Sequence, residues 1–179
     1  MQTQPVVNID RVWNTVLMPK LHDIFCGDAK VSYQAYIDTY GSVYTILQPD
    51  AYAKTANNNG QELYCRLFDF FDTYALKVYA AAPANDAELH RIYQAAWARF
   101  HPGLVLFKGL FTLLNKGWVR CQRAAGNMAI LELGEMALAA WGANVLEPIS
   151  PRLRMADVTC SFAGTSLDTD TVSTEFVWI

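Results

Sequence analysis

Several patterns that assign a protein to a functional class are missing from this 179-residue sequence. No lysine or arginine tract occurs, and the 14 basic side chains stand against 17 acidic ones, which excludes general binding to a phosphate backbone. The four cysteines show no CxxC or cysteine–histidine ligand spacing, and the glycines form no phosphate-binding loop. We therefore expect no nucleic-acid partner, no metal and no cofactor.

Signals for export or membrane insertion are also missing. The first ten residues have neither the basic start nor the continuous apolar stretch of a signal peptide. The longest apolar runs are interrupted by Lys108 or by Glu132 and Glu135, so no membrane span is expected. Charged residues make up only 17% of the chain and hydrophobic residues 53%, which is typical of one domain with a sizeable core. We expect a soluble protein of the cytoplasm or nucleus.

What is present is helical periodicity. Apolar residues recur at three- and four-residue steps, and strand-like alternation is missing up to residue 153, so we predict an all-α fold. The helix over 104–123 is apolar almost all round, which predicts a central position in the bundle. The predicted helices cover residues 9–25, 32–47, 61–82, 87–100, 104–123 and 128–146.

Prolines mark the expected irregularities. Pro19 lacks a backbone N–H and should kink or split the first helix. The residues His101-Pro102-Gly103 predict a sharp boundary between two helices. Pro148 and Pro151 are expected to stop the last helix.

Candidate catalytic groups are few. Cys26 follows His22 by four residues, but it ends an apolar stripe and no third orienting group is present. We favour a packing role and keep an enzyme that uses Cys26 or Cys121 as the weaker alternative. Two acidic pairs lack the differing environments that acid–base catalysis requires, so we interpret them as solvated helix faces. These pairs are Asp69 with Asp72 and Glu132 with Glu135.

The segment 32–47 carries more aromatic surface than helix packing requires. Its large side chains cover more than the roughly 100° stripe that a bundle helix buries, so some rings should remain at the surface. Tyrosine is enriched among interface hot spots, and the spacing leaves a partner-binding role and a structural role equally open. The side chains are Tyr33, Tyr36, Ile37, Tyr40, Val43 and Tyr44.

Several ordered motifs resemble the N-terminal repeat of the cullin family. Glu62-Leu-Tyr-Cys-Arg-Leu67 resembles the Leu-Tyr pair that opens the third cullin helix, and Thr39-Tyr40-Gly-Ser-Val43-Tyr44 is similar to a motif of the second. Segments 91–100 and 109–119 are similar to the Tyr-x-x-x-Trp-x-x-(Phe/Tyr) and Gly-Ile-x-x-Tyr-Leu-Asn-Arg-x-(Trp/Tyr)-Val motifs of the fourth and fifth. The matching positions are Tyr93, Trp97, Phe100, Gly109, Leu114, Asn115, Trp118 and Val119.

The resemblance implies a fold and its limits. It predicts a five-helix cullin-type repeat over residues 9–125 and the first helix of a second repeat over 126–153. Residues 1–8 and 154–179 are expected to be tails, the second of them divergent, irregular and disordered. After residue 153 no counterpart of the domain that binds a RING subunit follows, so we expect no RING partner.

The resemblance also implies a function without catalysis. In cullins the exposed faces of the second and fifth helices grip an adaptor, and the motifs are closest to cullins that hold Skp-type adaptors, with BTB-type adaptors as the alternative. Thr39, Leu113, Lys116 and Pro19 depart from the family pattern, which puts adaptor affinity and choice in question. The implied adaptor-binding residues are Tyr36, Ile37, Tyr40, Tyr44, Val105, Gly109, Thr112 and Leu113.

Two interpretations of the whole chain remain open at this point. One is a docking module that competes with full-length cullins for an adaptor. The other is a truncated cullin remnant without a stable partner. We favour the docking module, and size-exclusion behaviour would separate it from a self-associating remnant.

Overall fold

The computed structural model describes residues 8–27, 31–48 and 59–159, and within these ranges helix is the only regular secondary structure. The predicted all-α fold is confirmed. Three π-helical segments, labelled η, adjoin the α-helices. The elements in order are α1 (Ile9–Val12), η1 (Trp13–Leu17), α2 (Met18–Cys26), α3 (Tyr33–Leu47), α4 (Asn59–Ala80), α5 (Asp86–Leu110), α6 (Thr112–Leu114), η2 (Asn115–Val119), α7 (Arg120–Ala124), α8 (Leu133–Trp141), η3 (Gly142–Leu146) and α9 (Glu147–Thr159).

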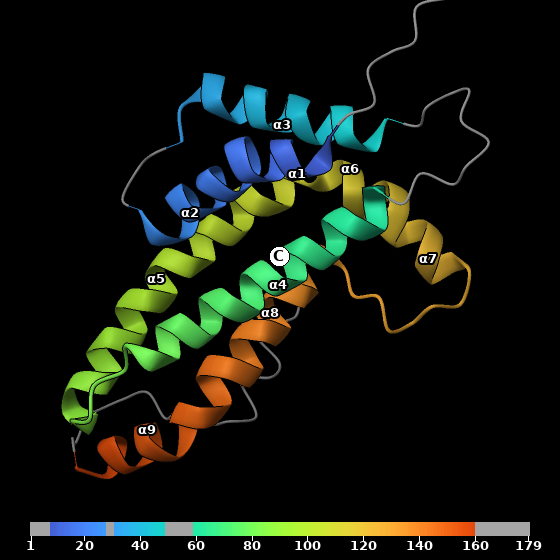
Figure 1. Cartoon of the computed structure of the whole chain (residues 1–179). Helices are drawn as coiled ribbons and strands as arrows, with labels where there is room; N and C mark the ends of the chain where they lie inside the picture. Colours follow the sequence, from blue (N-terminus) through green and yellow to red (C-terminus); the bar gives the residue numbers. More distant parts are fainter. Residues whose placement is uncertain (1–7, 28–30, 49–58, 160–179) are drawn as a thin grey trace, which may run out of the picture.

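The helices stack in the order shown in Figure 1. The two long helices α4 and α5 lie in the middle, α3 lies at one end of the stack, and α8 lies at the other end against α4. The helices α1 and α2 lie between α3 and the long helices in this view. None of the described helices is both long and apolar enough to cross a bilayer.

Aromatic rings fill much of the interior. The ring centroid of the fully buried Phe25 lies 5.1 Å from that of Phe71 and 5.7 Å from that of Phe100. Trp141 stacks on Phe100 with a centroid distance of 4.5 Å. These four residues come from α2, α4, α5 and α8, so one aromatic cluster, which we call the interior cluster, joins four helices.

Two prolines are accommodated by π-helical segments. Pro19 and Pro148 each lie two residues after the end of a π segment, η1 and η3. The N–H of Met18 donates to the carbonyl of Trp13, five residues back, and the residue after η3 makes the same kind of bond. At Pro19 the helical hydrogen bonds continue with a change of register between η1 and α2, and the kink or split of this helix stays a prediction. The predicted stop at Pro148 and Pro151 is wrong, because the bond register shifts locally and α9 continues to residue 159.

The predicted boundary at Pro102 is also wrong, because α5 passes through it. Pro102 and Ala98 are exposed, so the carbonyl that loses its helical donor can be hydrated. Gly103 is buried, and a Cβ at this position would lie 2.9 Å from Cε1 of Phe25. Close packing of α2 against α5 holds the helix together across the proline.

The last two predicted helices have different bounds. The segment 104–123 divides at Phe111 into α5, α6, η2 and α7. Its central position is confirmed for Phe107 and Leu110, which are buried, but not for Val105, whose side chain is 63% exposed.

The segment 128–146 becomes helical only at residue 133, after Gly126 takes a φ of 91°. Residues 160–179, most of the predicted tail, lie outside the described ranges.

Candidate functional site

One face of α3 anchors the predicted site to the bundle. Ser32 caps the helix, because its Oγ accepts a hydrogen bond of 3.2 Å from the N–H of Ala35. Thr39, Val43 and Ile46 are buried against the core. The hydroxyl of Thr39 donates to the carbonyl of Ala35 at 2.6 Å, so this departure from the cullin leucine affects packing inside the fold and not the outer surface.

A second stripe of α3, beside the buried one, carries exposed aromatic and apolar side chains. Tyr33 is 81% exposed, Ile37 42% and Tyr44 49%. Tyr40 lies between them and is half-buried. The four positions follow i, i+4, i+7 and i+11 spacing and so share one side of the helix. We call Tyr33, Ile37, Tyr40 and Tyr44 the α3 stripe.

Tyr36 joins α3 to the second half of the predicted site. A Cβ at Gly109 would lie 2.7 Å from the hydroxyl oxygen of Tyr36, so the tyrosine covers the glycine and any larger residue would displace the ring. Val105 precedes Gly109 by one turn of α5, and it is exposed together with Leu106. We define the docking surface as the α3 stripe together with Val105 and Leu106.

The structure exposes some of the predicted site residues and half-buries the others. Ile37, Tyr44 and Val105 are exposed. Sequence reasoning left out Tyr33 and Leu106, although Tyr33 lies one helical turn before Ile37 on a helix already noted for its tyrosines. The half-buried members are Tyr36, Tyr40, Gly109, Thr112 and Leu113.

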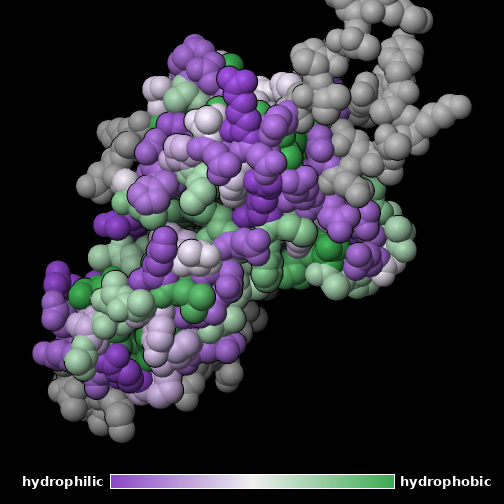
Figure 2. Space-filling model, in the orientation of Figure 1, coloured by the Kyte–Doolittle hydropathy of each residue, from purple (hydrophilic) through white to green (hydrophobic). Residues whose placement is uncertain are grey.

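Hydropathy colouring alone does not mark this surface. Figure 2 shows mostly hydrophilic colours at the top of the molecule, where α3 lies. Tyrosine counts as hydrophilic on that scale because of its hydroxyl, although its ring carries a large apolar area. Such a ring suits a surface that is exposed to water in one state and covered in another.

Other residues of the cullin-like motifs build the junction between η2 and α8. Asn115 Oδ1 accepts a hydrogen bond of 3.0 Å from the first backbone N–H of α8. The hydroxyl of Tyr64 lies 3.1 Å from the N–H and 3.2 Å from the carbonyl oxygen of Leu131. Trp118 packs on Tyr64 with a centroid distance of 5.2 Å. These motif residues stabilise the fold, and a partner would not touch their buried atoms.

Three of the acidic residues interpreted as solvated have structural partners, so that interpretation is wrong for them. Glu132 Oε2 accepts a hydrogen bond of 3.4 Å from the side-chain amide of Asn115. Glu135 Oε2 accepts one of 2.8 Å from the backbone N–H of Glu132 and pairs with Arg123 at 3.0 Å. Asp72 accepts a hydrogen bond of 2.7 Å from the side-chain amide of an η3 asparagine, Asn144. These carboxylates are needed at helix ends and contacts, which the i, i+3 spacing did not reveal.

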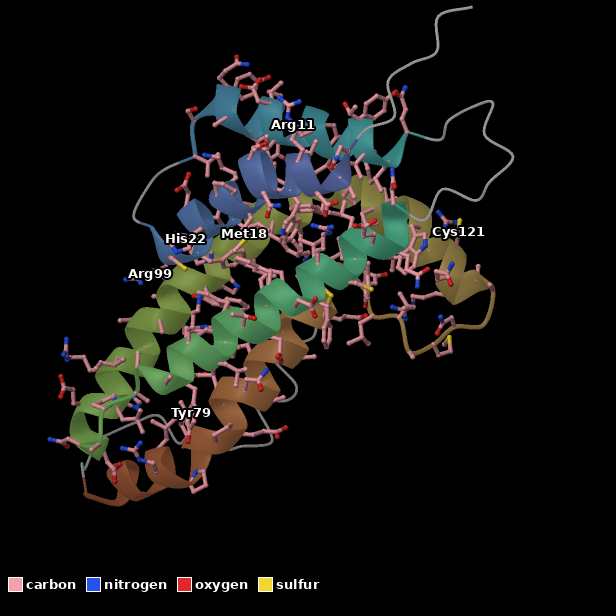
Figure 3. All side chains as sticks on the ribbon, in the orientation of Figure 1. Arg11, Met18, His22, Tyr79, Arg99 and Cys121 are labelled. Carbon is pink, nitrogen blue, oxygen red and sulfur yellow. The ribbon has the colours of Figure 1, made fainter. Side chains whose placement is uncertain are left out.

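The cysteine alternative gains no support from the geometry. Desolvation raises the pKa of Cys26, and the opposing effects of Lys77 and Arg99 are smaller. A raised pKa disfavours the thiolate that nucleophilic catalysis requires. Figure 3 shows His22 and Arg99 on the neighbouring helices α2 and α5. Within the described ranges no three His, Cys, Asp or Glu side chains gather as a metal ion would require.

Comparison with known proteins places the fold in a family. Residues 14–160 match the family's sequence model for the cullin alpha solenoid domain. The chain is 25% identical over 104 residues to cullin-1 of Caenorhabditis elegans, and 25% identical over 89 residues to cell division control protein 53 of Saccharomyces cerevisiae. The matched stretches cover 56% and 50% of this chain but only 13% and 11% of these relatives.

Proposed function

The chain belongs to the cullin family, and on this premise we propose that it is a non-catalytic docking module for a Skp-type adaptor of cullin-RING ubiquitin ligases. One observation carries the proposal: the α3 stripe exposes aromatic and apolar side chains, and Val105 and Leu106 are exposed on α5, whose Gly109 is covered by Tyr36 of α3. Covering such side chains on binding is favourable, and tyrosine is over-represented among residues that dominate binding energy.

The docking surface is also rigid, which lowers the cost of binding. A tyrosine side chain has only two rotatable χ angles, so its immobilisation costs little conformational entropy. The backbone beneath it is held by the Ser32 cap and by three buried residues of α3. On the rim, Gln34 donates to Asp38 at 2.8 Å, so polar groups border the apolar stripe as they do at many interfaces.

The first experiment measures binding of the purified chain to a Skp-type and a BTB-type adaptor, side by side. Tyr44→Ala should weaken Skp-type binding by roughly thirtyfold, which corresponds to about 2 kcal/mol for an aromatic hot-spot residue. Tyr79→Ala is the matched control, because Tyr79 is 41% exposed but lies at the end of α4. It should bind like the wild type.

Three outcomes would count against the proposal. Wild-type affinity in Tyr44→Ala would show that the docking face is placed wrongly. Equal losses in Tyr44→Ala and Tyr79→Ala would indicate unspecific adhesion, and preference for the BTB-type adaptor would assign another adaptor class.

Tyr40 stays the predicted centre of the patch, but its ring packs against the core. Binding by Tyr40→Ala must therefore be interpreted together with its unfolding free energy.

The 179-residue polypeptide should act as a competitor when it is added to a ligase reaction. Two proteins that bind one adaptor surface compete by mass action. If this chain and the full-length cullin bind the adaptor equally well and are present in equal amounts, the chain occupies about half of the adaptor. Titration into a reconstituted cullin ligase should slow substrate ubiquitination, and Tyr44→Ala should not. An unchanged rate at large excess would contradict competition. Self-association in size-exclusion chromatography would favour the remnant interpretation.

A further inference from the structure

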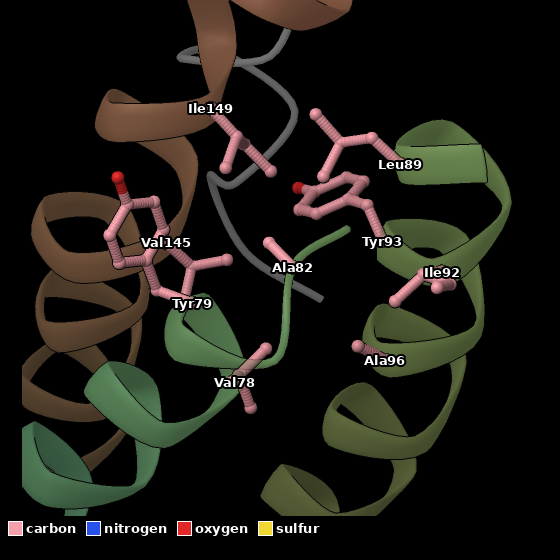
Figure 4. A pocket seen from close by; sticks show the side chains of 9 residues that line it. All are labelled: Val78, Tyr79, Ala82, Leu89, Ile92, Tyr93, Ala96, Val145 and Ile149. Carbon is pink, nitrogen blue, oxygen red and sulfur yellow. The ribbon is translucent and has the colours of Figure 1, made fainter. Parts of the chain in front are cut away.

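The two ends of α5 are held in different ways. Beside its first half, nine apolar or aromatic side chains from α4, the residues after it, α5, η3 and α9 close in on one another (Figure 4) and leave room for about one water molecule. At the other end, the last turn of α5 carries Gly109. Apart from α5 itself, the atoms nearest to a Cβ at this position all belong to Tyr36 of α3. This pair is a direct contact between α3 and the end of α5.

The backbone at Gly109 does not require a glycine. Among the described glycines only Gly126 has a positive φ, so the backbone of residue 109 does not exclude alanine. Inside a helix alanine is more favourable than glycine, because it loses less conformational freedom on folding. What excludes a side chain is Tyr36, since a Cβ at position 109 would lie 2.7 Å from its hydroxyl oxygen. The glycine therefore makes room for the tyrosine.

The conflict concerns the hydroxyl oxygen alone. The next two atoms of Tyr36, Cζ and Cε2, would lie 3.7 and 3.8 Å from the same Cβ, which is ordinary van der Waals contact. Tyr36→Phe would therefore make room for Gly109→Ala. With the hydroxyl present, the tyrosine ring is half-buried and packs against the core. Because close-packed interiors transmit displacements, Gly109→Ala should shift this ring and α3 with it.

Both members of the pair lie one helical turn from the docking surface. Val105 precedes Gly109 by four residues on α5, and Tyr40 follows Tyr36 by four residues on α3. Four residues correspond to about 6 Å along a helix and to the same helix face. A displacement at the contact therefore moves the two halves of the docking surface relative to each other.

We propose that Gly109 and Tyr36 are a positioning pair, which sets the spacing between the α3 stripe and the exposed α5 residues that the adaptor must match. The proposal rests on the proposed function and narrows it. Two residues that the cullin resemblance implied as adaptor-binding then act through their neighbours. Shape complementarity at an interface depends on such fixed spacing.

The test is a double-mutant cycle with the 179-residue chain, in which calorimetry measures affinity for a Skp-type adaptor. Gly109→Ala should weaken binding by about tenfold, less than loss of a hot-spot ring, because no contacting group is removed. Tyr36→Phe alone should bind within about twofold of the wild type. Adding Tyr36→Phe to Gly109→Ala should restore the affinity to within about twofold, because the oxygen in conflict is gone.

Gly142→Ala in η3 is the matched control, because nothing lies within 4 Å of a Cβ there. It should bind like the wild type. Urea unfolding of the same proteins gives a readout without the adaptor. Gly109→Ala should raise the unfolding midpoint more in the Tyr36→Phe background than in the wild type. If the wild type binds no adaptor, the proposed function fails, and the unfolding cycle still reports whether the pair is in contact.

Three results would overturn the proposal. The first is wild-type affinity in folded Gly109→Ala. The second is a loss of affinity in Tyr36→Phe alone, because the hydroxyl would then contact the adaptor directly. The third is a double variant that binds as weakly as Gly109→Ala, because the alanine would then act independently of the hydroxyl.

Discussion

The rings of the interior cluster and the rings of the α3 stripe differ in what surrounds them. Phe25 and Trp141 are buried among side chains from four helices, whereas Tyr33 and Tyr44 project from one helix into solvent. Tyr74 shows what burial demands of a tyrosine, because its hydroxyl donates to the carbonyl of Phe25 at 3.2 Å. A tyrosine thus stabilises the fold where its hydroxyl has a partner inside, and its ring is available for binding where packing leaves it in solvent.

The largest expected effect is on the buried side of this comparison. Trp141→Ala should lower the free energy of unfolding by about 3–5 kcal/mol, because it removes a stacked ring and leaves a cavity between α4, α5 and α8. Urea unfolding followed by circular dichroism measures the loss. The milder Trp141→Phe keeps most of the apolar contact and should lose less. A loss below 1 kcal/mol in Trp141→Ala would show that the cluster does not hold the helices together.

An intermediate effect is expected from pH. Burial raises the pKa of Tyr74 from 10.0 to about 12. Because the unfolded chain ionises at the lower pKa, the full stabilisation is present below pH 10.0 and is lost as the pH rises toward about 12. At 1.36 kcal/mol per pKa unit the loss approaches about 2–3 kcal/mol.

Unfolding free energies at pH 8 and pH 11 test this expectation. Tyr74→Phe is the control, because it removes the ionisable group and keeps the ring. Its stability should fall less between the two pH values than that of the wild type. Equal falls in both proteins would mean that other groups account for the alkaline loss.

The smallest effect is expected on the exposed side. Tyr33→Ala should change the unfolding free energy by no more than about 0.5 kcal/mol, because the side chain is 81% exposed. Chemical denaturation in parallel with Trp141→Ala gives the direct comparison. A loss above 1 kcal/mol would show that the α3 stripe belongs to the fold, and it would weaken the proposed docking role.

Local signals predicted some elements well. Ser32 and the tyrosine spacing placed α3 at Tyr33–Leu47, and Pro83 closed the helix that the structure ends at Ala80. Both signals act within a few residues, because a cap or a periodic stripe is a property of the helix itself. Proline is different. The free-energy cost of a proline inside a helix depends on what compensates the backbone hydrogen bond that it cannot donate. A π segment does so before Pro148, and close packing of a neighbouring helix does so beside Pro102.

The candidate site was also predictable from the sequence only in part. The residue spacing showed that α3 has more rings than it can bury, because periodicity can be read directly from the sequence. The order of the motifs likewise indicated the cullin family. Which rings stay exposed was decided by packing: Tyr36 is half-buried over Gly109, whereas Tyr33 and Val105 remain in solvent. Exposure depends on which helices meet and at what register, and that requires residues far apart in the sequence to come together.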